Sequence, residues 1–271
     1  MLKRTKKIIS ITIILYFFLI TCHTFVSIKD GQGILSAGGN ISVSIFFEMQ
    51  AGGGNGSEIV DLTMMAVLSV IGSGLFIYIK NNNMFDSVQQ RLRYKRFLMK
   101  SVITTFLAAT GLSIFTNLYE MSLINWFYFP FTYKMNDPFL RSHRPSNFTN
   151  NDFVEILLFI ILGAVGWGIF AIFIFSIGLF VRKNAFYIIV GPIIGLVLIL
   201  LPILGNIHSL IWRVFSYSWF VYTLIAPGQY TFISEAPPIK PGLSFIIAAM
   251  IYLAAAVLLI SIWYKKQRKE A

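Results

Sequence analysis

Six apolar runs along the chain are long enough to cross a lipid bilayer as α-helices. They cover about residues 8–28, 59–79, 98–118, 153–181, 185–207 and 243–264. Because a helix needs about 20 apolar residues to span a hydrocarbon core about 30 Å thick, each run predicts one membrane-spanning helix. The fourth run is the longest and predicts a tilted helix or one that extends past the interface. The pattern therefore predicts an all-α integral membrane protein, with a single transmembrane domain over residues 1–271.

The composition supports this class. Hydrophobic residues make up 56% of the chain and charged residues 12%, and the mean hydropathy is +0.74. Soluble domains carry about 25% charged residues. A water-soluble fold of this composition would expose large apolar patches, which excludes that class.

Lysine and arginine gather in alternate loops. The N-terminus, residues 80–97, residues 182–184 and the C-terminal tail together hold most of the 22 basic residues, with few acids among them. Because lysine and arginine are retained on the cytoplasmic side, both termini are predicted to be cytoplasmic, in agreement with an even number of spans. The basic clusters are short and lie next to the membrane, so orientation and lipid headgroups account for the net charge of +11 without nucleic acid.

Two of the predicted outer segments have unusual compositions. Residues 29–58 are rich in glycine and serine around an apolar island at 41–47, which is expected to be a short strand or a dip into the interface. Residues 208–242 are about as apolar as a span but are interrupted by Arg213 and by Pro227-Gly228. They predict one or two short helices in the outer leaflet, because each half is too short to cross.

The segment at 85–100, FDSVQQRLRYKRFLMK, predicts a short amphipathic helix that leads into the third span. Its apolar residues recur at helical spacing and share one face; they are Phe85, Val88, Leu92 and Met99. Two interpretations of its basic residues stay open: they anchor the helix to anionic lipid headgroups, or they dock a cytoplasmic partner. The residues expected to make the docking contacts are Phe85, Arg91, Leu92, Arg93 and Arg96.

In its predicted topology the chain resembles the permease subunits of ABC-2-type transporters. The shared features are six spans, both termini inside and a basic helix after the second span. The hexapeptide Arg91-Leu92-Arg93-Tyr94-Lys95-Arg96 is similar to the sequence found there in small permeases of Gram-positive bacteriocin or lantibiotic export and immunity systems. The resemblance covers most of the chain as topology but only this hexapeptide as sequence. The long glycine-rich segment 29–58 departs from the most compact members.

This resemblance implies several partners. A separate cytoplasmic ATPase would dock on residues 85–100, and a second permease subunit or a second copy of the chain would complete the transporter. The substrate would be a peptide or a lipid-like amphiphile. The location would be the cytoplasmic membrane, and the wealth of Ile, Phe, Lys and Asn is in keeping with a low-GC Gram-positive bacterium.

The acidic residues gather near the predicted outer ends of the spans. They are Glu58, Asp61, Glu120, Asp152 and Glu155. One interpretation is that they face interfacial water; the other is that they line an acidic outer vestibule that meets a cationic peptide. No predicted span carries an ionisable group near its centre, which disfavours a proton-coupled secondary carrier, because such carriers bury acids or histidines in relays.

Motifs for catalysis are not found. The chain lacks the GxxxxGK[ST] phosphate-binding loop, the HExxH zinc motif and the Gly-x-Ser-x-Gly nucleophile motif, so no enzyme activity, cofactor or metal is expected. The histidines, His23, His143 and His208, lie far apart. ATP hydrolysis would belong to a partner. The alternatives are a stand-alone immunity or accessory protein that binds a peptide at its outer loops, and a secondary carrier.

Small residues indicate where helices approach one another. The sequence GAVGWG at 163–168 allows a second helix to pack closely, and we expect that helix to come from the same subunit. The single cysteine, Cys22, excludes an intrachain disulfide and is expected to be buried in the first helix rather than lipidated.

Overall fold

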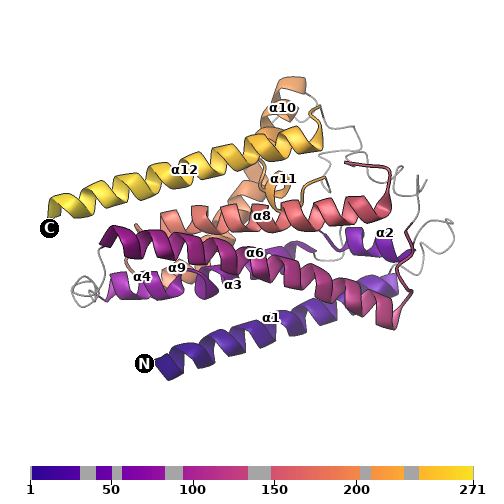
Figure 1. The fold of residues 1–271 in the computed structure, drawn as a ribbon, viewed down its shortest axis with the longest axis horizontal. Coiled ribbons are helices and arrows are strands. Elements are labelled where there is room, and N and C mark those ends of the chain that lie inside the picture. The colour runs from indigo at the N-terminus through magenta and orange to yellow at the C-terminus, as the bar shows by residue number, and fades with distance from the viewer. Residues whose placement is uncertain are drawn as a thin grey trace.

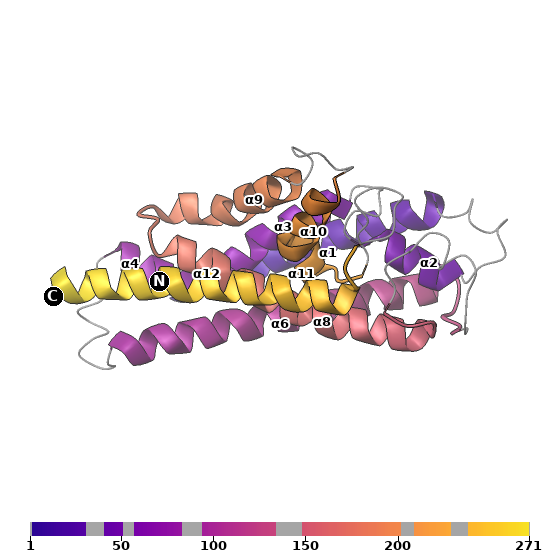
Figure 2. The same ribbon diagram turned by 90° about the horizontal axis from the view of Figure 1, so that it is seen from above.

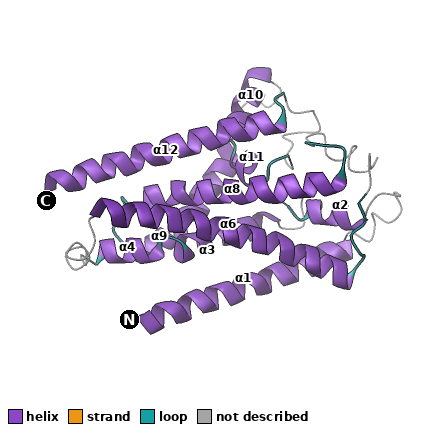
Figure 3. Ribbon diagram, viewed as in Figure 1, coloured by secondary structure: helices purple, strands orange, loops and turns teal. Residues whose placement is uncertain are grey.

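The computed structural model describes residues 2–30, 41–50, 57–82, 94–133, 148–201, 209–228 and 238–270. Every regular element in these ranges is a helix (Figure 3). The long helices are α1 (Leu2–Asp30), α6 (Tyr94–Phe127), α8 (Asp152–Gly178) and α12 (Pro241–Glu270). The shorter helices are α2 (Ile41–Glu48), α3 (Ser57–Ile71), α4 (Gly74–Asn81), α9 (Asn184–Leu200), α10 (Leu210–Trp219) and α11 (Val221–Ile225). The predicted all-α class is confirmed.

Four helices in the described part of the chain are long and apolar enough to cross a bilayer. Their membrane-length segments are Ser10–Lys29, Lys95–Phe127, Asp152–Gly178 and Pro241–Gln267. Large apolar side chains such as Leu107, Val257 and Leu258 are more than half exposed on their outer faces. This surface is compatible with a membrane location. The other two predicted spans, 59–79 and 185–207, correspond to shorter helices.

The long helices run roughly side by side (Figures 1 and 2). We call one end the basic end: there α4 ends, α6 begins, α8 turns into α9, and both chain termini lie. The other end, the opposite end, holds α2, the last turns of α6 and the first turns of α8. Both ends of the described chain therefore lie at the same end of the bundle, and their predicted cytoplasmic orientation stays a prediction.

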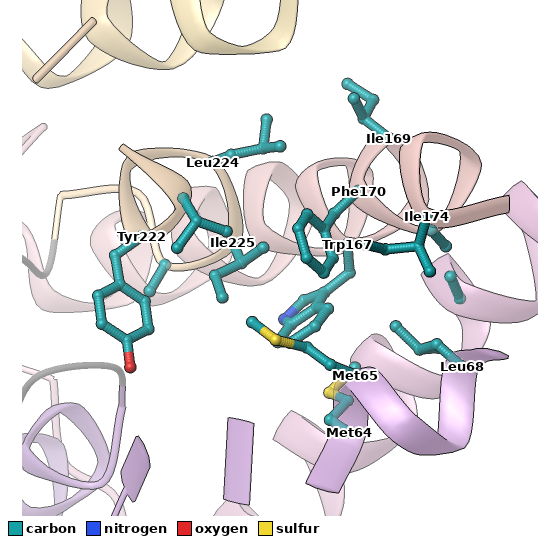
Figure 4. Close-up of a cluster of buried hydrophobic side chains, with 14 of the residues drawn as sticks. Met64, Met65, Leu68, Trp167, Ile169, Phe170, Ile174, Tyr222, Leu224 and Ile225 are labelled. Carbon is teal, nitrogen blue, oxygen red and sulfur yellow. The ribbon is translucent and has the colours of Figure 1, made fainter. Parts of the chain in front are cut away.

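The centre of the bundle is α8, which packs against α6, α11 and α12. Phe170 and Phe175 of α8 are completely buried, and Trp167 joins Met65 of α3 and Ile225 of α11 in one apolar cluster (Figure 4). Burial of such side chains contributes about 1.5–3 kcal/mol each in water. Within a membrane the same contacts act through close packing of complementary surfaces.

The second predicted span, 59–79, is two helices rather than one. The chain leaves the helix at Gly72-Ser73, between α3 and α4. A Cβ atom on Gly72 would lie 2.9 Å from the Cα atom of Thr105, so the break lets α6 approach the backbone. The Ser73 hydroxyl also hydrogen-bonds the hydroxyl of Tyr187 on α9. Glycine–serine pairs are a common cause of such breaks, and here tertiary contacts hold the break open.

The fifth predicted span, 185–207, is described as a helix only over α9, Asn184–Leu200. Residues 202–208 lie outside the described residues. Pro192 is inside α9, and Gly195 meets α3, because a Cβ atom there would lie 2.0 Å from the sulfur of Met65. The two shorter predicted spans thus pack against each other.

The described part of the segment after α9 forms two short helices, in agreement with the prediction of one or two; their place in the outer leaflet stays a prediction. α11 is wholly buried, whereas α10 exposes Leu210 and Ile211, the latter to 83%. Glycines of α8 make room for α11: a Cβ atom would lie 1.8 Å from the Leu224 carbonyl oxygen at Gly166, and 3.2 Å from the Ile225 carbonyl oxygen at Gly163. The expectation that the 163–168 glycines pack a helix of the same subunit is confirmed.

Two expectations are wrong. The apolar island at 41–47 is not a strand; it forms most of α2, whose described side chains are all buried. The alternative, a dip into the interface, stays a prediction. Phe46 and Phe47 pack edge-on against Phe159 of α8, which explains the burial. Cys22 is exposed on α1 instead of buried, because the buried face of that helix runs through Tyr16, Ile20 and Thr24.

Candidate functional site

The basic end presents a surface of exposed cationic side chains. Three lie in the first turns of α6, two in the turn between α8 and α9, and two near the end of α12: Lys95, Arg96, Lys100, Arg182, Lys183, Lys265 and Lys266. Among the side chains that the structure describes, this end carries no carboxylate. A surface of this kind attracts anionic lipid headgroups or an acidic protein face.

Lys80, at the end of α4, turns inward instead. Its Nζ donates hydrogen bonds to the carbonyl oxygens of Gly178, Leu179 and Val181, at 3.0, 2.8 and 2.6 Å. Gly178 is the last residue of α8, Leu179 is its C-cap and Val181 lies in the turn that follows. At such a helix end the last C=O groups lack intrahelical partners, and the helix dipole favours a cation. Partial burial lowers the pKa of Lys80 to about 8, so its ammonium form still predominates at pH 7.

A second bond supports the same junction. The side-chain amide of Asn81 donates to the side-chain oxygen of Asn184 at 2.7 Å. Together, Lys80 and Asn81 contact the chain immediately before and immediately after Arg182-Lys183. The end of α4 and the α8–α9 turn are therefore joined as one unit.

Phe76 of α4 joins three long helices at this end. Its ring stacks on Phe97 of α6 at 5.1 Å between centroids and lies edge-on to Phe175 of α8 at 5.3 Å and Trp263 of α12 at 6.2 Å. The side chain is 2% exposed. Aromatic pairs of this geometry contribute about 0.5–1.5 kcal/mol beyond the area they bury. α4 is thus packed into the bundle at its inner face and bonded to the α8–α9 turn at its end.

The structure describes one of the five predicted docking residues, Arg96. Phe85, Arg91, Leu92 and Arg93 lie outside the described residues. Arg96 is exposed in the first turn of α6. The predicted helix at 85–100 is described only from residue 94, where it forms the start of α6 and continues without a break into the third span.

At the opposite end, α6 carries a buried acid. Glu120 is 4% exposed, and its Oε2 accepts a hydrogen bond from the Gln50 side-chain amide at 3.1 Å, just beyond α2. One turn earlier, Thr116 bonds the Tyr16 hydroxyl of α1 at 3.1 Å. A further pair, Thr21 and Tyr119, lies 2.8 Å apart. Polar side chains from α1 and α6 and the segment after α2 therefore meet inside an otherwise apolar bundle.

Asp61 of α3 belongs to the same region. Both Asp61 and Glu120 interact electrostatically with the Tyr16 hydroxyl. Two carboxyl groups therefore act electrostatically on one buried tyrosine. We call Tyr16, Gln50, Asp61, Thr116 and Glu120 the polar cluster.

Asp152 and Glu155 lie elsewhere, in the first turn of α8. Asn151 caps this helix by accepting bonds from the N–H groups of residues 153 and 154. The Glu155 carboxylate accepts bonds from the backbone N–H groups of Phe148 and Thr149 at 3.0 and 2.9 Å. Asp152 and Glu155 are 3% and 2% exposed. Acids in a first turn favour the positive end of the helix dipole, so these two have a structural role.

Of the predicted outer acids, Glu120, Asp152 and Glu155 are buried in the fold. The two interpretations, contact with interfacial water and an acidic outer vestibule, stay predictions. The side chain of Glu58 lies outside the described residues, although its backbone starts α3. α6 continues to Phe127 and so includes Glu120, which lies toward the end of the helix and not near its centre. The predicted third span ended at residue 118.

Several residues of the two regions were not recognised from sequence. Lys80 was counted only among the basic loop residues, and Tyr16 and Phe76 only among apolar spans. A lysine directly after an apolar run, or a tyrosine inside one, is a weak signal by itself. In the described part of the chain, no three or more histidine, cysteine or acidic side chains are arranged to hold a metal ion.

Comparison of the chain with protein-family models, with curated proteins and with solved structures finds no match.

Proposed function

We propose that this protein is the membrane-spanning subunit of an ATP-driven transporter of the ABC-2 type. It exports or expels a peptide or lipid-like amphiphile, and a separate cytoplasmic ATPase docks on residues 85–100. The observation that carries the proposal is the continuity of α6. This single helix of 34 residues begins with the exposed Lys95 and Arg96 and includes Glu120 of the polar cluster.

A transporter without its own motor needs a stiff path from the docking surface to the substrate-binding interior. At a rise of about 1.5 Å per residue, α6 is about 50 Å long, which exceeds the thickness of a hydrocarbon core. Movement of the basic end can therefore reach the polar cluster along one unbroken element. The inward-facing contacts of Phe76 and Lys80 support the proposal, because they join α4, on the other side of residues 83–93, to the same bundle.

The test combines charge reversal with a matched control. Arg93→Glu/Arg96→Glu changes the charge by the same amount as Lys265→Glu/Lys266→Glu, which lies at the same end but on α12. We expect the first pair to abolish ATP-dependent protection of cells against a panel of cationic amphiphilic peptides, with normal amounts of protein in the membrane. The second pair should retain protection. Equal protection in both variants contradicts the proposed docking role of residues 85–100.

A further control distinguishes an ATP-driven transporter from a stand-alone immunity protein. If cells keep full protection when the candidate ATPase carries an inactivating substitution in its phosphate-binding loop, protection does not require ATP hydrolysis. That result contradicts the transporter proposal and supports peptide binding at the outer loops.

The polar cluster favours a second candidate function, an ion-coupled secondary carrier. Buried acids within membrane-length helices commonly bind coupling ions, and Glu120 is such an acid. This candidate predicts transport in ATP-free vesicles under an imposed ion gradient, and loss of that transport in Glu120→Gln. Transport that requires ATP and ignores the gradient excludes it.

A further inference from the structure

The turn between α8 and α9 is bonded to the end of α4 on both sides of its two cationic residues. Lys80 bonds the carbonyl of Val181 at 2.6 Å, and Asn81 bonds the side chain of Asn184 at 2.7 Å. Between these two anchored positions stand Arg182 and Lys183, both exposed. The cations are therefore held beside the end of α4, which precedes the predicted docking segment.

The distribution of positive charge at the α8–α9 turn suits a protein partner. Lys80 directs its ammonium group to backbone carbonyls inside the fold, whereas Arg182 and Lys183 direct theirs to the surface. Lipid headgroups in a fluid leaflet adjust to any arrangement of cations and need no fixed spacing. A folded protein with complementary acidic residues does need one, because a rigid interface gains affinity when its partners are pre-organised.

We propose that Arg182 and Lys183 form a second contact of the docking surface for the same cytoplasmic ATPase, and that Lys80 and Asn81 are the residues that position it. The inference rests on the proposed function. The ATPase meets the chain at two places, the segment 85–100 and the α8–α9 turn, and its facing surface is acidic. Docking thereby acts on α8 directly as well as on α6.

The test uses a photoreactive amino acid placed singly at Arg96, Arg182 or Phe180 of the full chain in its own membrane. Phe180 is 45% exposed and lies in the same turn, but it is apolar and serves as the matched control. We expect positions 96 and 182 to crosslink one and the same protein, which mass spectrometry must identify as carrying a phosphate-binding loop. Position 180 is expected to crosslink lipid only.

The outcomes separate the two proposals. If neither position 96 nor position 182 reaches such a protein, the proposed function fails. If position 96 does and position 182 yields only lipid adducts, the second contact fails while the proposed function stands.

Lys80 is tested in the same assay. Lys80→Met removes the three bonds to the end of α8, so the crosslink from position 182 should be lost while that from position 96 persists. Lys80→Arg keeps the charge and the donors and should restore the crosslink from position 182. A persistent crosslink from position 182 in Lys80→Met contradicts the positioning role, and the crosslink from position 96 shows that the variant is folded.

Discussion

The rings of Phe76 on α4 and Phe97 on α6 stack at 5.1 Å with an interplanar angle of 24°. These residues flank the segment at 83–93, which contains most of the predicted docking residues. The stack therefore fixes the position of α4 relative to α6, the two helices that the segment 83–93 connects. It also brings the start of α6 against α8 and α12, because the same Phe76 ring contacts Phe175 and Trp263.

We expect Phe76→Ala to destabilise the protein strongly. Removal of a buried phenylalanine costs about 3–5 kcal/mol, part of it for the cavity that remains. Leu75→Ala is the control, since Leu75 is the neighbouring residue on α4 and is 57% exposed. Thermal unfolding in detergent should show a large fall in Tm for the first variant and little change for the second. Equal Tm values mean that Phe76 does not hold the basic end together.

Two glycines, Gly166 on α8 and Gly111 on α6, are expected to give opposite effects. Gly166→Ala should lower the Tm, because its Cβ atom would lie 1.8 Å from the Leu224 carbonyl oxygen and α11 would have to move. Gly111→Ala should leave the Tm unchanged or raise it, because nothing lies within 4 Å of its Cβ position and alanine favours a helix by up to about 1 kcal/mol. A cysteine introduced at Thr223 reports the movement by increased labelling in the first variant alone. Unchanged labelling there would show that α11 does not depend on the gap at Gly166.

The pair of hydroxyl groups in the polar cluster suits a double-mutant cycle. Tyr16→Phe and Thr116→Val each leave one buried hydroxyl without its partner at 3.1 Å, so each should destabilise the protein. The double variant should cost less than the sum, because two apolar groups leave nothing unsatisfied. The coupling energy within membranes averages about 0.6 kcal/mol, which sets the precision required of the unfolding measurement. Strict additivity contradicts a direct interaction.

At the start of α8, Glu155→Ala should cost more than Glu155→Gln. The alanine variant leaves the N–H groups of Phe148 and Thr149 without an acceptor, whereas glutamine keeps an oxygen and loses only the charge. A buried donor left unsatisfied costs about 1–3 kcal/mol. Unfolding in denaturant measures the difference. If the two variants are equally stable, the carboxylate acts through the helix dipole alone.

Much of the fold was predictable from sequence because the relevant information is local. Long apolar runs sufficed for α1, α8 and α12. The interruption at Pro227-Gly228 falls just after the end of α11, but the break between α10 and α11 at Phe220 was not predicted, and Arg213 lies inside α10. The break at Gly72-Ser73 was missed because its cause is distant: Thr105 and Tyr187 are far along the chain. A glycine and a serine inside an apolar run are otherwise compatible with a continuous helix.

The candidate site was predictable only in part, for the same reason. Charge segregation along the sequence predicted the basic end, but not that Lys80 would bond α8 while Arg182 stays exposed. The burial of Glu120 depends on Gln50, which follows an apolar island whose structure the pattern left open. The local sequence predicts where a residue lies along a helix, but the residue that it contacts on another helix depends on the tertiary fold.

The break between α3 and α4 has a consequence for biogenesis. Neither piece is long enough to cross a hydrocarbon core alone, and the groups that stabilise the break, Thr105 and Tyr187, are synthesised after it. We therefore expect this segment to leave the translocon late, together with α6 and α9. In a nascent chain that stops before α6, we expect α3 and α4 to be only loosely inserted in the bilayer.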